Sequence, residues 1–336
     1  MRLIEPLGLL HPPASAHAVA GGFALYFAGG PAAFTHARLV GDGRIVPITA
    51  IPAEYQPALA AATAPRPWAG LPPGRVAVMG VLNVTPDSFS DGGRHAEPAA
   101  AIAAGRAMLD AGADLLDIGG ESTRPHAAPT PPEEERARIL PVIRALAAEG
   151  AIISVDTRHA ATMRAALSAG ARIINDVSGL AHDPESPATV AAHNAPVILM
   201  HMRATPDAMH HHATYTDVAA EVAAELAARI SAATAAGIAP EAIAIDPGIG
   251  FAKTAEHNRE LLARLPLLTS LGRPLVVGVS RKGFIGLLSG EKQADRRTPG
   301  SIAAGLHATL HGANVLRVHD VAATVQALRV WQGLSR

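Results

Sequence analysis

The sequence predicts an α/β protein built as a (β/α)8 barrel, the TIM-barrel class, with a small N-terminal β-containing extension. Three observations carry this prediction. From about residue 75 onward, short apolar runs alternate with Ala-rich amphipathic stretches, and this unit recurs eight times. The runs are apolar throughout, as in parallel strands buried on both faces. Five of the amphipathic stretches are followed by glycine, the residue that most often closes a helix in the left-handed conformation.

Each barrel strand is expected where an apolar or β-branched run precedes a polar turn. In chain order the runs are Val76–Leu82, Asp114–Ile118, Ala151–Val155, Arg172–Asn175, Val197–Met200, Ala242–Ile245, Pro274–Val279 and Asn314–Val318. Helices are expected between them, among others at Pro98–Ala111, Pro132–Ala148, Ala160–Ala169, Asp217–Ala236 and Gly300–His311. The closing glycines are Gly112, Gly150, Gly170, Gly237 and Gly312.

A doubly wound open sheet is the alternative arrangement of alternating strands and helices. It would carry a glycine-rich phosphate turn after its first strand. The segment Asn83–Phe89 is not such a turn. We therefore expect a barrel over residues 75–336, with its chemistry at the C-terminal ends of the strands.

Residues 1–74 do not follow the repeat and are expected to form the extension, packed on the barrel. Ala37–Val40 and Arg44–Ile48 flank Gly41-Asp42-Gly43, which predicts a β-hairpin. The segment Ala60–Pro73 is rich in alanine and proline, and we interpret it as a connector.

Composition excludes several kinds of protein. The chain of 336 residues has no cysteine, which excludes disulfides, thiolate catalysis and cysteine-ligated metals. A formal net charge of −1 argues against nucleic acid or an acidic membrane surface as partner. The Leu7–Leu10 patch faintly resembles a signal peptide, but it is short and lies between Glu5-Pro6 and His11. We expect a cytoplasmic protein with small-molecule substrates.

Polar residues follow every expected strand. One of them alone, such as Asp156 or Asp176, is equally compatible with a helix cap. Eight sets on one rim favour a ligand site. In strand order they are Asn83, then Asp117 with Gly119–Pro125, then Asp156-Thr157-Arg158, Asn175-Asp176, Met200-His201-Met202, Asp246-Pro247-Gly248, Ser280-Arg281-Lys282 and Arg317-Val318-His319-Asp320.

Part of this rim suits a flat heterocycle. Ionised Asp156 and Asp246 accept hydrogen bonds only, whereas Asn175 both donates and accepts. Such a set recognises a ring with N–H donors and a carbonyl, because an analogue without the donors leaves the carboxylates unpaired. Lys282 is placed to donate to the carbonyl, with a solvated lysine at a helix start as the alternative.

The rest of the rim suits an anion and a metal ion. Arg317, His319 and Arg124 supply positive charge for a group such as a phosphate. Asn83 offers a neutral oxygen to a Mg²⁺ ion held otherwise by phosphates and water. Two other features are weaker indications of function. The tract His210-His211-His212 lacks companion carboxylates, which favours a solvated loop, and the segment around Ser280 lacks a nucleophile elbow.

Together these motifs closely resemble the dihydropteroate synthase family of folate-pathway enzymes. The first two loops read as in that family, Asn83-Val84-Thr85-Pro86-Asp87-Ser88-Phe89 and Glu121-Ser122-Thr123-Arg124-Pro125. Ile249 and Ala252 depart from it, standing where members commonly carry an aromatic residue and a glycine. The similarity covers about residues 75–335 and rests on Asn83–Gly93, Asp117–Pro125, Ser154–Arg158, Asn175–Gly179, Met200–Met202, Asp246–Thr254, Ser280–Lys282 and Arg317–Asp320.

The resemblance implies a role for each matching residue. It implies Mg²⁺ as the cofactor, with Asn83 as its ligand. Pterin binding is implied for Asp156, Asn175, Met200, Asp246, Phe251 and Lys282, and pyrophosphate binding for Asn83, Thr123, Arg317 and His319. The residues near p-aminobenzoate would be Thr85, Pro86, Phe89, Arg124, Pro125 and Ser280. The catalytic set would be Asp156, Asp246, Lys282, Arg317 and His319.

The resemblance also implies a reaction. A transferase of this family condenses 6-hydroxymethyl-7,8-dihydropterin pyrophosphate with p-aminobenzoate, giving 7,8-dihydropteroate and pyrophosphate. The substitution would be dissociative, with no covalent enzyme intermediate, and the first two loops would exclude water with Gly92 and Gly93 as hinge. A homodimer through the helices after the late strands is the family expectation, and sulfonamides are expected to compete with p-aminobenzoate.

Two other functions remain open at this point. A pterin-binding barrel that presents a methylated folate to a corrinoid protein would share Asp156, Asn175 and Asp246, but it has no need for Lys282 or for Arg317 with His319. A non-catalytic paralogue would have lost part of the anion site. Both are disfavoured, because all of these residues are present.

Overall fold

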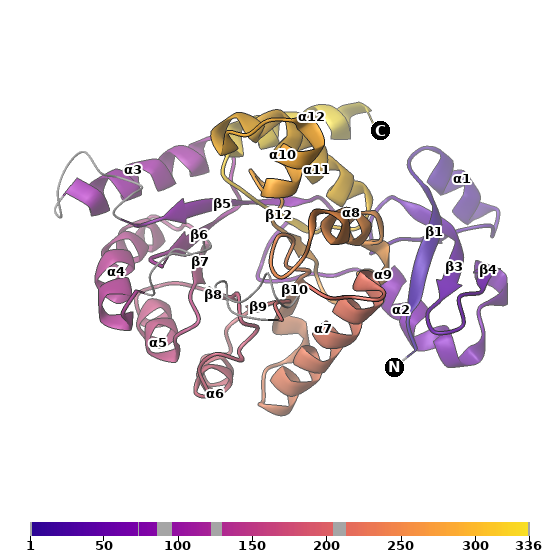
Figure 1. The fold of residues 1–336 in the computed structure, drawn as a ribbon, viewed down its shortest axis with the longest axis horizontal. Helices are drawn as coiled ribbons and strands as arrows, with labels where there is room; N and C mark the ends of the chain where they lie inside the picture. The colour runs from indigo at the N-terminus through magenta and orange to yellow at the C-terminus, as the bar shows by residue number, and fades with distance from the viewer. Residues whose placement is uncertain (1, 73, 86–95, 122–129, 204–212, 335–336) are drawn as a thin grey trace.

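The structure is a computed structural model that describes residues 2–72, 74–85, 96–121, 130–203 and 213–334. Figure 1 shows parallel strands surrounded by helices, with the N-terminal extension (indigo) packed at one side. The barrel strands are ordered β10-β9-β8-β7-β6-β5-β12-β11. A parallel bridge between Ile245 and Leu275 joins the last strand to the first. The predicted (β/α)8 barrel is confirmed.

Each barrel strand lies where the sequence predicted one. The strands are β5 (Ala77–Asn83), β6 (Leu115–Gly119), β7 (Ile153–Asp156), β8 (Ile173–Asp176), β9 (Val197–Met200), β10 (Ile243–Asp246), β11 (Val276–Val277) and β12 (Val315–Val318). Strand β11 is shorter than the predicted Pro274–Val279. The backbone N–H of Leu275 donates to the side-chain oxygen of Asn314 at 2.9 Å, so a side chain replaces a ladder partner there.

The five predicted helices are also present, with ends that differ by at most two residues. The glycines after them have φ between 89° and 109°, which is the left-handed conformation expected of closing residues. The barrel helices are α3 (Ala96–Asp110), α4 (Pro132–Ala148), α5 (Ala160–Ser168), α6 (Ser186–Ala192), α7 (Val218–Ala235), α8 (Ala255–Ala263), α9 (Pro266–Thr269), α10 (Gly283–Ser289), α11 (Thr298–Leu310) and α12 (Val321–Leu334).

The extension is a small antiparallel sheet with two helices. Its elements are β1 (Ile4–Leu10), α1 (Ala14–Ala20), β2 (Leu25–Tyr26), β3 (Ala33–Leu39), β4 (Ile45–Pro47) and α2 (Gln56–Thr63). Strands β3 and β4 form the predicted hairpin, with Arg38 opposite Ile45. The Leu7–Leu10 patch, for which a signal peptide was disfavoured, lies in strand β1, paired along β3. One interpretation was partly wrong, because the first residues of the predicted connector, Ala60–Thr63, end α2.

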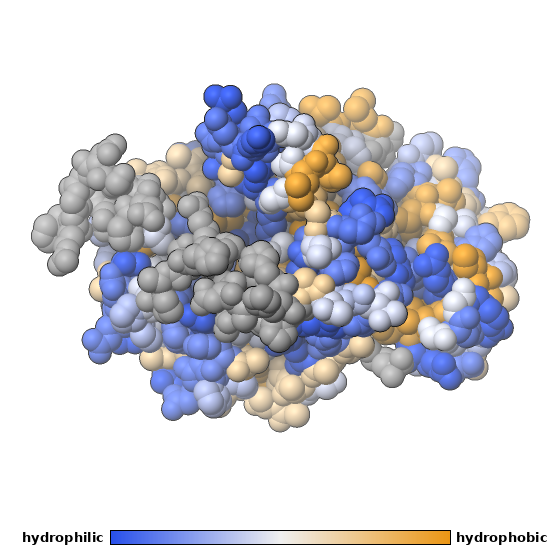
Figure 2. All heavy atoms as spheres, in the orientation of Figure 1, coloured by the Kyte–Doolittle hydropathy of each residue, from blue (hydrophilic) through white to orange (hydrophobic). Residues whose placement is uncertain are grey.

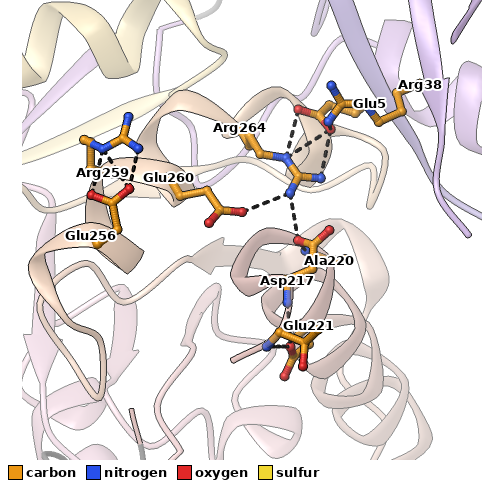
Figure 3. Close-up of polar contacts among 10 residues, drawn as sticks. Glu5, Arg38, Asp217, Ala220, Glu221, Glu256, Arg259, Glu260 and Arg264 are labelled. Carbon is orange, nitrogen blue, oxygen red and sulfur yellow. Dashed lines mark hydrogen bonds and ion pairs between the residues drawn. The ribbon is translucent and has the colours of Figure 1, made fainter. Parts of the chain in front are cut away.

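The extension has its own core and is fixed to the barrel by charge and by one tryptophan. Figure 3 shows Arg264, at the end of α8, reaching the carboxylate of Glu5 from β1. The two groups lie 3.0 Å apart, and Arg264 also binds Asp217 at 2.8 Å. Trp68 is buried among the first residues of the barrel strands and donates to the backbone oxygen of Ala242 at 2.8 Å.

Candidate active site

The described side chains that the sequence analysis selected lie at one end of the barrel. Asn83, Asp156 and Asp246 are the last residues of their strands, β5, β7 and β10. Asn175 is the penultimate residue of β8, and Arg317 that of β12. Parallel strands of a barrel have their C-terminal ends at the same rim, which is where barrel enzymes place their chemistry.

A fully buried carboxylate organises one side of this rim. Asp117, in the middle of β6, accepts from Ser154 Oγ at 2.6 Å and from Asn175 Nδ2 at 2.9 Å. It also accepts from Arg317 Nε at 2.6 Å, while Arg317 Nη2 donates to Asp156 Oδ2 at 2.7 Å. Three hydrogen bonds, one of which is the ion pair with Arg317, offset the cost of burying the Asp117 charge.

Charge balance sets the protonation of this cluster. Burial raises the pKa of Asp156, and the neighbouring Arg317 opposes that rise. Burial tends to lower the pKa of Arg317, but Asp117 and Asp156 outweigh it and hold that pKa above its usual range. In the ligand-free protein Arg317 and Asp156 therefore partly neutralise each other, and a ligand that binds either one competes with their ion pair.

The second side of the rim is formed by residues at the end of β10 and in the segment after β11. Asp246 accepts from the backbone N–H of Gly248 at 2.7 Å. Lys282 donates from Nζ to the backbone oxygen of Ile249, and its ammonium lies 4.8 Å from the ring centre of Phe251. Burial lowers the pKa of Lys282 to about 8, although Asp246 opposes the shift. Burial raises the pKa of Asp246, and Lys282 and Arg317 oppose that rise, so the two sides of the rim interact.

The two departures from the family pattern lie in this loop. Ile249 is fully buried, and only its backbone oxygen meets the lysine. Ala252 has φ of +48°, a left-handed conformation in which glycine carries no steric cost. Both side chains are aliphatic, so neither can form a hydrogen bond or an ion pair with the charged groups of the rim.

His319 and Ser280 form a third contact. The backbone N–H of His319 donates to Ser280 Oγ at 3.1 Å, and Nδ1 lies 3.0 Å from the same oxygen. Burial, reinforced by the nearby Arg317, lowers the pKa of His319 to about 4. This pKa favours a neutral ring in the ligand-free protein at neutral pH, whereas the sequence analysis expected His319 to supply positive charge to a bound anion.

The remaining selected residues divide into two groups. Asn83 and Thr85 are half-buried on and just after β5, and Met200 is buried at the end of β9. Outside the described residues lie Pro86, Phe89, Thr123, Arg124 and Pro125, as well as Gly92, Gly93 and the tract His210–His212.

The rim fits a Mg²⁺ ion that takes most of its ligands from a substrate. Among the described residues, no group of three or more His, Cys, Asp or Glu side chains is arranged to hold a metal. The side-chain amide of Asn83, half-buried at the end of β5, makes no hydrogen bond within the described part of the chain. One free neutral oxygen at the rim is compatible with Mg²⁺ that takes most of its ligands from phosphates and water.

Sequence reasoning missed two supporting elements. Asp117 was noted as a strand-end residue but given no role, although a carboxylate within an apolar strand signals a buried polar partner. The second element is a chain of contacts from the buried Lys253 to the partly exposed Glu225: Lys253 Nζ lies 2.9 Å from His201 Nδ1, and His201 Nε2 lies 2.9 Å from Glu225. Lys253 also binds the backbone oxygens of Gly248 and Phe251, and so fixes the loop beside Lys282.

Comparison with known proteins gives a consistent result. The family model described as "Pterin binding enzyme" matches residues 79–319. A dihydropteroate synthase of Mycobacterium leprae is 49% identical over 261 residues, covering 76% of this chain and 92% of the relative. A Xanthomonas albilineans dihydropteroate synthase solved with 4-aminobenzoic acid is 51% identical, covers 77% of this chain and 93% of that one, and has a TM-score of 0.74. Its structure with 7,8-dihydropteroate gives 49% identity, coverages of 77% and 94%, and a TM-score of 0.71. The chain belongs to the pterin-binding enzyme family and, within it, to the dihydropteroate synthases.

Proposed function

We propose that this chain condenses 6-hydroxymethyl-7,8-dihydropterin pyrophosphate with p-aminobenzoate to form 7,8-dihydropteroate and pyrophosphate in folate biosynthesis. One observation carries the proposal for the site. Acceptors from three strands, Asp156, Asn175 and Asp246, share a rim with the cations Lys282 and Arg317. This combination suits a substrate with a donor-rich ring at one end and an anion at the other.

The acceptors would hold the pterin. Asp156 and Asp246 accept from its amino and ring N–H groups, and Asn175, fixed by Asp117, adds an amide. Lys282 donates to the ring carbonyl, while Met200 and Phe251 contact the ring faces. Because the carboxylates lie where cationic charge spreads from the reacting carbon into the ring, they stabilise that charge as it develops.

The reaction is a substitution at the pterin methylene carbon. The carbon–oxygen bond breaks and its electron pair leaves with pyrophosphate, while the amine of p-aminobenzoate forms the new carbon–nitrogen bond and loses a proton. Arg317 binds the departing anion, and His319 donates a hydrogen bond to it. An anion at this place favours protonation of His319, which is neutral in the ligand-free protein.

Mg²⁺, held by Asn83 and the substrate phosphates, would supply positive charge that stabilises the leaving group. Thr123 would complete the pyrophosphate site. For the second substrate we propose Ser280 with Thr85, Pro86, Phe89, Arg124 and Pro125, on the basis of family resemblance.

We further propose a cytoplasmic homodimer. The lack of cysteine supports a reducing compartment. The helices after the two last strands expose large apolar side chains, among them Leu287 and Leu288 of α10 and Leu334 of α12, with exposed fractions of 74%, 69% and 82%. Figure 2 shows apolar surface in the upper part of the molecule, where these helices lie in Figure 1. Among the described residues, no helix is long and apolar enough to span a bilayer.

Competition kinetics test the proposed second-substrate site. A sulfonamide that mimics the arylamine should raise the KM for p-aminobenzoate and leave kcat unchanged. Noncompetitive inhibition, or none, would argue against the assignment of Ser280 and the first two loops. Sedimentation velocity of the protein tests the dimer, and a single species of monomer mass would refute it.

A further inference from the structure

A cavity of about 730 Å³ lies at the opposite end of the barrel from the candidate active site. Its barrel wall includes Ala77 and Val315, the first residues of β5 and β12. Its outer wall comes from the extension, including Phe27, and from the connector, including Trp68. The volume lies within the ~300–1,000 Å³ typical of small-molecule sites.

The walls of this cavity are mainly apolar. Phe27 and Trp68 are nearly fully buried, and the indole N–H of Trp68 is already bound to the backbone oxygen of Ala242. Trp331, from α12, completes an aromatic lining. Rigid aromatic surface of this kind favours the apolar part of a ligand, because contact removes it from water at no cost in side-chain ordering.

The charge in the cavity is one-sided. The cations Arg66 and Arg75 line it, whereas no Asp or Glu does among the described residues. His11 also lines it, but burial lowers its pKa, so it adds no charge at neutral pH. Arg75 is paired with Asp114. Arg66 has no carboxylate partner among the described residues, and burial lowers its pKa to about 10, so it keeps its charge at neutral pH.

The guanidinium of Arg66 is incompletely bound. Nη2 donates to the backbone oxygens of Ala61 and Thr269, at 3.1 and 2.8 Å. Nε and Nη1 are buried and have no hydrogen-bond partner in the described part of the chain. Because these two nitrogens have almost no accessible surface, a ligand carboxylate must draw the guanidinium toward the cavity to pair with them. An unpaired buried cation is costly, so that pairing gains more than it would at an exposed arginine.

We propose that this cavity binds a small apolar carboxylate, with Phe27 and Trp68 contacting its hydrocarbon part and Arg66 pairing with its charge. Such a ligand would contact both the extension and the barrel. It would therefore stabilise the docking of residues 1–74, a part of the chain that the family match from residue 79 does not include.

The chain offers a selective probe for this cavity. Its only two tryptophans are Trp68 and Trp331, and both line the cavity. Tryptophan emission of the full-length protein should change saturably with octanoate, an aliphatic anion chosen because it does not resemble p-aminobenzoate. Octan-1-ol, its neutral counterpart, should bind at least about tenfold more weakly, and excess p-aminobenzoate should not displace octanoate.

Two variants separate charge pairing from general apolar binding. Arg66→Met should weaken octanoate binding at least about tenfold and leave octan-1-ol binding unchanged. Arg273→Met is the matched control, because Arg273 also has a buried nitrogen without a partner but does not line the cavity. It should bind octanoate like the wild type. Equal affinities for octanoate and octan-1-ol in the wild type, or no saturable change, would overturn the proposal even if Arg66→Met did not fold.

Discussion

Arg317 and Asp117 form an ion pair of 2.6 Å between β12 and β6, and this pair sets the arrangement of half the rim. Asp117 is fully buried and also binds Asn175, so one carboxylate fixes both a proposed pterin ligand and the proposed pyrophosphate ligand. The guanidinium reaches on to Asp156. Asp117 is thus a positioning residue for groups on three other strands.

Replacing Asp117 by asparagine should impair catalysis even though the side chain of Asp117 is not proposed to contact the substrate. The loss of its charge frees Arg317 and Asn175 from their common partner, and we expect kcat/KM for the pterin substrate to fall on the order of 100-fold. Steady-state kinetics at fixed p-aminobenzoate measure this. Ser154→Ala, which removes only one hydrogen bond to Asp117, should cost about 1 kcal/mol of unfolding free energy and little activity. Equal activities of Asp117→Asn and the wild type would contradict this role.

Lys282→Ala and Asp246→Asn should each abolish most turnover. Both remove a charge beside the proposed pterin ring, and losses on the order of 100- to 1,000-fold in kcat are expected for preorganised charges of this kind. Release of pyrophosphate provides the measurement. His211→Ala serves as the control, since no function is assigned to the histidine tract, and its rate should equal that of the wild type.

The pH dependence of the rate should report Lys282. Its pKa is lowered to about 8, so the ammonium form that donates to the ring carbonyl is present below pH 8 and is lost above it. If that form is required, kcat/KM should fall about tenfold per pH unit on the alkaline side. Lys282→Arg, whose guanidinium does not titrate there, should flatten this limb. A wild-type profile that stays level well above pH 8 would show that Lys282 needs no proton.

Glu5→Gln should destabilise the protein. The carboxylate is 4% exposed and lies between Arg38 and Arg264, so the substitution leaves two cations without their common partner. A loss of about 2–3 kcal/mol in unfolding free energy is expected, measured by denaturant titration. Arg44→Met breaks the exposed pair with Asp42 and should change stability by less than about 1 kcal/mol. Similar effects of the two substitutions would refute a docking role for Glu5.

Much of the fold followed from local signals in the sequence. The strand and helix positions in the barrel were predicted from the spacing of apolar residues and from closing glycines such as Gly112 and Gly170. Both glycines have a left-handed backbone in the structure. The extension was harder, because β1 pairs with β3 about thirty residues away and the Leu7–Leu10 patch has no local feature that marks it as a strand. Local sequence patterns do not show which distant segments pair as strands.

In the site, too, some features could be predicted from local sequence and others depend on long-range contacts. Asp156, Asp246 and Lys282 suggested their chemistry only as a set on one rim, because alone Asp156 is also compatible with a helix cap and Lys282 with a solvated helix start. The hydrogen bonds that converge on Asp117 depend on the nearness of Arg317, which is 200 residues away in the chain. The lowered pKa of His319 depends on burial and on the same arginine. Only the folded arrangement supplies those distances.

The central claim is tested most directly by incubating the purified protein with 6-hydroxymethyl-7,8-dihydropterin pyrophosphate, p-aminobenzoate and Mg²⁺ and quantifying both products. One 7,8-dihydropteroate is expected for each pyrophosphate released, and no dihydropteroate when either substrate is omitted. Failure to form dihydropteroate with both substrates and Mg²⁺ present would contradict it.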